Sequence, residues 1–149
     1  MKGLREGGFL MAKVHQIAGR IFARKLREHG VRAINPAQGR ILFVLWREDN
    51  IPISELARRT ALEKSTLTSM LDRLEESGFV ERVRSTEDRR TILLRRTEKD
   101  KACQKVYVEV SREMNELFYA GLSVKQIDEF EGVLRHTLET LTAFEAENR

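Results

Sequence analysis

The segment from Ile53 to Thr97 constrains the fold of this 149-residue chain more than any other part. It opens with a short helix-forming stretch, residues 53–60, followed by a second one, residues 64–74, that is rich in hydroxyl side chains. In the second stretch the apolar residues recur three and four positions apart, which predicts a helix with one face against a core. These residues are Leu67, Met70, Leu71 and Leu74.

The other side of this predicted helix carries short hydroxyls and one long donor. Its candidate binding residues are Ser65, Thr66, Thr68, Ser69 and Arg73. A helix that enters the major groove of DNA, about 12 Å wide, needs short donors near its start and longer ones behind them. The unpaired backbone N–H groups of its first turn also favour phosphate. An ordinary surface helix, capped and solvated by its Ser and Thr residues, explains the same pattern about equally well when this helix is taken alone.

A two-stranded hairpin is predicted directly after this helix. Residues 79–84 and 91–96 are rich in β-branched and apolar side chains, and a short polar link joins them. Arg84, Arg89 and Arg90 gather around the tip, where an arginine could enter a minor groove. Asp88 is unfavourable beside phosphate, so we expect it to orient a neighbouring arginine through a charge-assisted hydrogen bond. A plain solvated hairpin is the alternative.

Amphipathic helices are predicted at both ends of the chain. Residues 9–29 have helical apolar spacing, and Asn35-Pro36 is a typical helix start before a stretch, residues 41–46, that should be buried on most sides. Capping boxes at Thr97–Asp100 and Ser123–Gln126 predict two more helices. The apolar positions expected on the first are Cys103, Val106, Val110, Met114 and Leu117, and those on the second are Ile127, Phe130, Leu134, Leu138 and Leu141.

These terminal helices lie outside the segment that would form a compact DNA-binding core, and their apolar stripes need a partner. Interlocking with a second copy would give a twofold homodimer, as expected of a protein that binds pseudo-palindromic sites. A closed monomeric bundle is the alternative, which we weight at roughly one in six against the dimer. The expected organisation of the single chain, residues 1–149, is a DNA-binding lobe at 36–97 with dimerisation helices at 1–34 and 98–149.

Charge and composition exclude several classes of protein. The formal net charge of +4 is unevenly placed: residues 1–35 carry eight Lys and Arg against two Asp and Glu, residues 36–100 thirteen against twelve, and residues 101–149 six against nine. No apolar run approaches the ~20 residues that span a bilayer, and no secretory signal is present, so we expect a cytoplasmic protein with no membrane contact. A lone cysteine and three histidines without companions at ligand spacing predict no metal site. No catalytic constellation or phosphate loop is present, so we expect neither an enzyme nor a cofactor.

Two runs of residues carry a family resemblance. Residues 65–82 and the stretch Asp88-Arg89-Arg90 through Thr97-Glu98-Lys99 resemble the MarR family of transcriptional regulators. The resemblance implies a homodimer of winged helix-turn-helix subunits, usually a repressor, that binds a pseudo-palindromic operator. It would place Ser65, Thr66, Thr68, Ser69 and Arg73 at the major groove and Arg90 in the minor groove, with Asp88 holding the wing arginine. Glu63 and Arg96 depart from the family's common aspartate cap and apolar strand residue.

The family resemblance also implies an effector, such as a small aromatic or phenolic compound or an oxidant of cysteine. We expect Cys103 to be a buried, inert thiol because it lies on an apolar stripe, with redox sensing at about one in ten. Trp46 and Phe43 could line an effector crevice, although core packing is the stronger expectation for both. A winged-helix module that binds an acidic protein partner instead of DNA is the alternative function.

Overall fold

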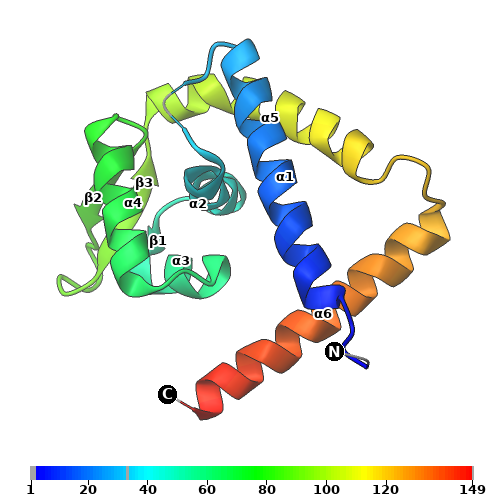
Figure 1. The fold of residues 1–149 in the computed structure, drawn as a ribbon. Coiled ribbons are helices and arrows are strands. Elements are labelled where there is room, and N and C mark those ends of the chain that lie inside the picture. The colour runs from blue at the N-terminus through cyan, green and yellow to red at the C-terminus, as the bar shows by residue number, and fades with distance from the viewer. Residues whose placement is uncertain (1–2, 33, 149) are drawn as a thin grey trace. The chain divides into compact units, whose positions relative to one another are not determined.

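The computed structural model describes residues 3–32 and 34–148 and is mainly helical with one small sheet (Figure 1). The chain divides into two compact units, Met1–Arg112 and Glu113–Arg149. None of the helices in the described part of the chain has the length and apolarity that a membrane span requires. The expected fold class, mainly α with a small hairpin, is confirmed.

The first two helices begin and end close to where the sequence predicts. Helix α1, Gly7–Glu28, is followed by Gly30 at a φ of +82°, a left-handed conformation that glycine adopts without strain. Helix α2, Pro36–Arg47, begins with a complete capping box between Asn35 and Gln38.

Helix α2 is buried or half-buried on most sides, as the sequence predicts, and only Arg40, Phe43 and Arg47 on one face are exposed. Ile41, Leu42 and Leu45 have no exposed surface, whereas Phe43 is 45% exposed. The guanidinium of Arg47 lies 4.5 Å from the centre of the Phe43 ring. The ring of Phe43 is therefore covered by Arg47 of the same helix and does not pack in the core.

Helices α3, Ile53–Thr60, and α4, Lys64–Glu76, follow one another through a short turn. Ala61 makes this turn at a φ of +53°. Leu67, Leu71 and Leu74 are all buried, as their helical spacing predicts, and Gly78 at a φ of +78° ends the helical path. The helix-turn-helix pair is therefore anchored to the core by one face of α4.

The sheet has three strands, not the two that the sequence predicts. Strands β2, Val80–Arg84, and β3, Ile92–Arg96, form the expected antiparallel hairpin, with Glu81 opposite Arg95. The extra strand β1, Ile51–Pro52, pairs with the other edge of β3, so the order is β1-β3-β2. Two residues are too short to show an alternating pattern, which is why the sequence does not reveal β1.

Helix α5, Glu98–Phe118, begins with only half of the expected capping box. The hydroxyl of Thr97 accepts a bond from the N–H of Asp100, but the carboxylate of Asp100 does not return to Thr97. The N–H of Thr97 donates instead to the carbonyl of Phe79, 3.4 Å away. Asp100 is used elsewhere, as described below. Cys103 is half-buried, so the expectation of a buried thiol is wrong.

The second unit consists of the end of α5 and helix α6, Val124–Glu147. Its capping box, between Ser123 and Gln126, is confirmed. Within the unit, Phe118 contacts the rings of Tyr119 and Phe130, and the hydroxyl of Tyr119 donates to Glu131 over 2.7 Å. This bond lowers the pKa of Glu131 below its usual value.

Candidate nucleic-acid interface

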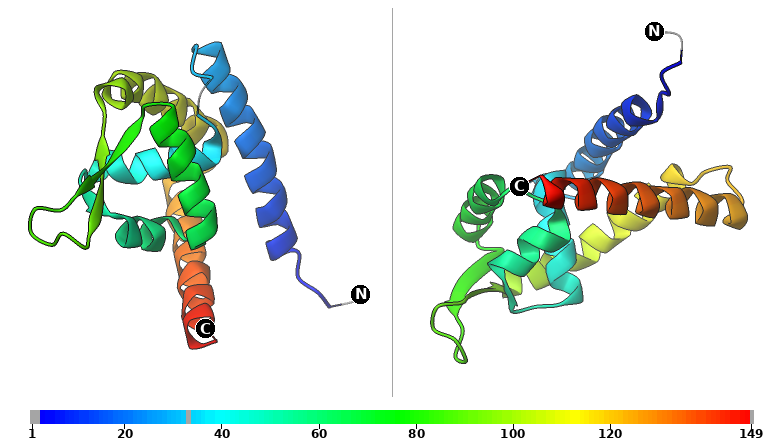
Figure 2. Two further views of the ribbon diagram at one scale, coloured as in Figure 1. Left: turned by 90° about the vertical axis from the view of Figure 1, so that its left-hand side faces the viewer. Right: turned by 90° about the horizontal axis from the view of Figure 1, so that it is seen from below.

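The predicted binding face of α4 is exposed along its whole length. Figure 2 (left) shows this helix at the front of the first unit, with the hairpin beside it. The residues that the sequence assigned to this face are all exposed: Ser65, Thr66, Thr68, Ser69 and Arg73. The structure therefore leaves short hydroxyls near the start of the helix and a longer cation behind them open to a ligand.

The start of α4 lacks a side-chain cap. Glu63 precedes the helix and makes no capping bond, unlike the Asn35 and Ser123 caps elsewhere in the chain. The hydroxyl of Thr68 donates to the carbonyl of Lys64 over 2.8 Å, so it faces outward mainly as an acceptor. The first-turn N–H groups of a helix without such a cap remain available to an anion.

The hairpin tip is shaped by side-chain bonds to the backbone and contains neither glycine nor proline. The hydroxyl of Ser85 accepts bonds from the N–H groups of Glu87 and Asp88 at 3.2 and 3.3 Å. The carboxylate of Asp88 then accepts the N–H of Arg90 and the hydroxyl of Thr91, both at 3.0 Å. These bonds replace the special turn residues that the sequence lacks.

Asp88 therefore orients the backbone of Arg90 rather than an arginine side chain. The expected charge-assisted bond to a guanidinium is absent among the described residues, and this expectation is wrong for the free chain. Arg84, Arg89 and Arg90 are all exposed, and none forms an ion pair within the described part of the chain. The tip thus presents three uncommitted positive charges.

Arg82, which the sequence analysis did not select, ties the hairpin to α4. Its guanidinium donates to Asp72 over 2.6 Å and to Glu75. Burial lowers the pKa of Arg82, but the bonds to both carboxylates outweigh this and raise it overall. Asp72 would otherwise place a negative charge beside the exposed hydroxyls. The sequence could have indicated this contact, because the basic Arg82 follows shortly after the acidic residues Asp72 and Glu75 near the end of α4.

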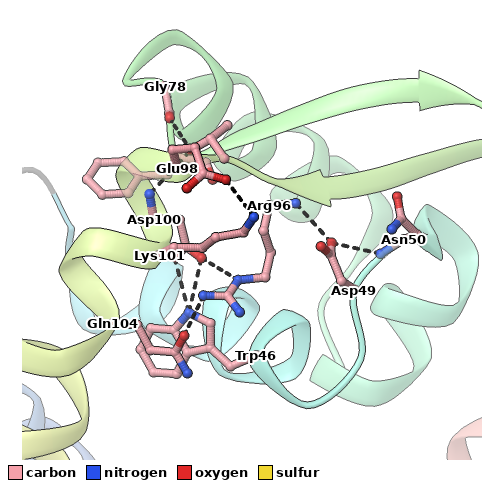
Figure 3. Close-up of polar contacts among 11 residues, drawn as sticks. Trp46, Asp49, Asn50, Gly78, Arg96, Glu98, Asp100, Lys101 and Gln104 are labelled. Atoms are coloured by element: carbon pink, nitrogen blue, oxygen red, sulfur yellow. Dashed lines mark hydrogen bonds and ion pairs between the residues drawn. The ribbon is translucent and has the colours of Figure 1, made fainter.

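A second tie holds the other hairpin strand to α5 and α2 (Figure 3). The Nε of Arg96 donates to the carboxylate of Asp100 over 2.5 Å, and a terminal nitrogen donates to Gln104. The same carboxylate accepts the indole N–H of Trp46 at 3.1 Å. The side chain of Asp100 is fully buried and that of Arg96 is only 11% exposed. Arg96 thus belongs to a buried polar network that joins β3 to α5 and α2.

On α3 one carboxylate serves two arginines. Glu55 accepts bonds from Arg58 and Arg59 on the same helix, and Arg59 also pairs with Glu48. The bonds from Arg58 and Arg59 lower the pKa of Glu55 to about 2. Because Glu55 and Glu48 together balance the charges of Arg58 and Arg59, α3 contributes little free positive charge to the interface.

No group of His, Cys, Asp and Glu that could hold a metal occurs among the described residues. The two aromatic candidates for an effector crevice have other contacts. Trp46 donates to Asp100 and touches the ring of Tyr107 with an edge, at 4.9 Å between centroids. Phe43 lies under Arg47. These contacts favour core packing for Trp46.

The comparisons with known proteins agree with this geometry. The MarR family model matches residues 34–92. The uncharacterized HTH-type transcriptional regulator YfiV of Bacillus subtilis is 32% identical over 99 residues, 58% of this chain and 62% of that protein. The HTH-type transcriptional repressor IacR of Pseudomonas putida is 31% identical over 105 residues, 68% of this chain and 63% of that protein. The chain thus spans somewhat less than two thirds of these relatives.

A solved structure extends the likeness to nearly the whole chain. A mutant MarR from E. coli, crystallised in complex with operator DNA, is 26% identical and has a TM-score of 0.78. The alignment covers 88% of this chain and 92% of that one. Helices, hairpin and chain order therefore match a fold that contacts DNA in that protein.

Proposed function

We propose that the chain, whose residues 34–92 match the MarR family model, is a double-stranded DNA-binding transcriptional regulator that acts as a repressor. In this proposal α4 enters the major groove and Arg90 enters the neighbouring minor groove. The relatives YfiV and IacR are named as regulators, not as enzymes.

One observation carries the proposal: the exposed face of α4 and the hairpin tip both offer uncommitted donors. The hydroxyls of Ser65 and Ser69 and the guanidiniums of Arg84, Arg89 and Arg90 have no side-chain partner in the described part of the chain. The carboxylate of Asp72 beside this face of α4 is paired with Arg82. Such an arrangement suits a polyanion with readable base edges.

The proposal includes a homodimer. Helix α1 leaves Phe9, Leu10, Val14 and Ile17 between 45% and 64% exposed. In the second unit, α6 carries an apolar stripe that the short accompanying end of α5 cannot cover, and Leu138 and Leu141 are 59% and 61% exposed. Apolar helix faces of this size are typical of interfaces between subunits.

The proposal extends to control by a small effector, as the family resemblance implies. Such a compound must bind one dimer geometry better than the other, because equal affinity shifts no equilibrium. The half-buried thiol of Cys103 has no charged partner in the described residues and gives no support to an oxidant as the signal.

Selection of bound sequences from random duplex DNA tests the proposed function. We expect the enriched duplexes to share a motif with twofold symmetry, and their affinity to fall steeply with salt. A winged-helix module that binds an acidic protein would instead enrich no motif and would bind every duplex weakly. That second outcome would refute sequence-specific regulation.

A further inference from the structure

The basic excess of the N-terminal segment has no role in the interface described so far. Residues 1–35 carry eight Lys and Arg against two Asp and Glu, whereas α4 and the hairpin lie in a nearly neutral stretch. Part of this excess lies at the end of α1 and in the connection to α2, where Arg27 and Arg32 are both exposed.

Arg27 and Arg32 line a groove together with Arg73 of α4. The groove has a volume of about 390 Å³, and Asn35, Gln38 and Glu76 are among its other lining residues. Within the described part of the chain, none of the three guanidiniums is within ion-pairing distance of a carboxylate. Glu76 offsets one of the three positive charges, so the groove keeps an excess of positive charge.

This groove continues the exposed face of α4. Arg73 lies one helical turn beyond Ser69, so both side chains leave the same face of the helix. In Figure 2 (left) the hairpin lies to one side of α4, while α1 and its connection to α2 lie to the other. The arginine groove is therefore on the side of α4 away from the hairpin tip.

DNA that receives α4 in its major groove has a phosphate backbone on both sides of that helix. The hairpin supplies arginines on one side only. Arginine guanidiniums bind phosphate oxygens through two parallel hydrogen bonds. The charge, the polar lining and the continuity with α4 all fit a backbone phosphate on the second side.

We propose that Arg27 and Arg32, together with Arg73, form a phosphate-binding groove that holds the DNA backbone on the side of α4 opposite the hairpin. This inference rests on the proposed function. It gives the basic N-terminal segment a role that carries no sequence information, since phosphate contacts fix the position and register of a protein on DNA but do not select bases.

The test uses the full chain with Arg27→Ala, Arg32→Ala and the double substitution. Arg20→Ala is the matched control, because Arg20 is exposed on the same helix and does not line the groove. Fluorescence anisotropy is measured for the selected duplex and for an unrelated duplex of the same length. Each titration is repeated at several chloride concentrations and, at matched ionic strength, in inorganic phosphate.

Each groove substitution should weaken binding to both duplexes by the same factor. Because it removes one phosphate contact from each subunit of the proposed dimer, it should reduce the slope of log affinity against log salt by about 1.8. Between about 50 and about 200 mM salt, the wild type should lose about 12-fold more affinity than each single variant. The control should keep the wild-type slope. Circular dichroism should show that all four variants keep the helical content of the wild type.

Three results would overturn the proposal. An unchanged slope, or an equal change in the Arg20 control, would show that the groove makes no phosphate contact of its own. A loss of affinity for the selected duplex alone would mean that the groove contacts bases and contributes to sequence specificity. If inorganic phosphate displaced DNA from the wild type but not from the double variant, the groove would be a site for a free anion and not for the DNA backbone. If the wild type bound neither duplex, the proposed function itself would fail.

Discussion

At the scale of single residues, neighbouring side chains of the hairpin tip have different roles: Asp88 shapes the loop, and Arg90 is exposed to a ligand. Asp88 fixes the loop by accepting bonds from the backbone of Arg90 and the hydroxyl of Thr91. The guanidinium of Arg90 remains exposed. The carboxylate thus shapes the loop without neutralising the arginine side chain, so the cation stays available to DNA.

Replacing Arg90 with alanine should weaken binding of the selected duplex by roughly 1–3 kcal/mol, the range of a lost specific contact. The loop should persist, because Asp88 bonds to the backbone at position 90 and not to the side chain. Arg95→Ala is the control, since Arg95 pairs with Glu81 within the hairpin, away from the tip. Equal affinities for Arg90→Ala and the wild type in anisotropy titrations would show that the tip does not contact DNA.

Tyr107 presents a second problem at the scale of one residue. Its side chain is buried, and its hydroxyl has no partner within the described part of the chain. Burial raises the pKa of Tyr107, which keeps the group neutral. The hydroxyl fits only because residue 39 is glycine: an added Cβ there would lie 1.5 Å from the Tyr107 oxygen.

Tyr107→Phe should therefore increase the free energy of unfolding by about 1 kcal/mol, since it removes an unpaired polar atom from the core. Gly39→Ala should decrease it by about 1–3 kcal/mol through overpacking. The double variant should recover only part of that loss, because the ring carbon Cζ would still lie 2.5 Å from the new Cβ. Urea unfolding of the four proteins measures these differences. A destabilised Tyr107→Phe variant would mean that the hydroxyl has a stabilising partner.

At the scale of elements, the sequence predicts what local periodicity and capping determine. The spacing of Leu67, Leu71 and Leu74 and the Asn35 cap both lead to helices that are observed. The sequence does not reveal structure that depends on contacts between residues far apart along the chain. Strand β1 exists because it pairs with β3, and the Thr97 capping box is half formed because Asp100 binds Trp46 and Arg96 instead. Nothing near Asp100 in the sequence reveals that tertiary competition.

The Arg96–Asp100 pair should be the strongest link between the hairpin and the helices. Either single substitution, Arg96→Leu or Asp100→Leu, leaves a charge in a buried setting and should cost about 3–5 kcal/mol of unfolding free energy. The double substitution removes both charges and should cost less than either single change. Thermal or urea unfolding measures all three.

The exposed pair between Glu81 and Arg95 is the matched control within the same hairpin. Its side chains are 46% and 48% exposed, so its removal should cost no more than about 1 kcal/mol. Additive losses at Arg96 and Asp100 would show that the two residues stabilise the protein independently and would contradict a coupled network.

At the scale of the whole molecule, each unit has apolar surface that it cannot bury by itself. The first has the exposed positions of α1, and the second has those of α6, none of whose residues is buried. A sequence-based argument predicts the stripes from their spacing but cannot say what covers them, because the spacing is the same for an internal and an intermolecular contact.

Leu141→Glu tests the dimer. A carboxylate on the apolar stripe of α6 would be buried without a partner in a subunit interface, so we expect dissociation to monomers and loss of high affinity for a twofold duplex. Ala143→Glu adds the same charge on the opposite face of the same helix and should leave both properties intact. Sedimentation equilibrium measures the mass, and anisotropy measures the affinity. A Leu141→Glu protein with the mass and affinity of the wild type would place the interface elsewhere, whereas monomers that still bound the twofold duplex tightly would show that operator binding does not depend on pairing of the chains.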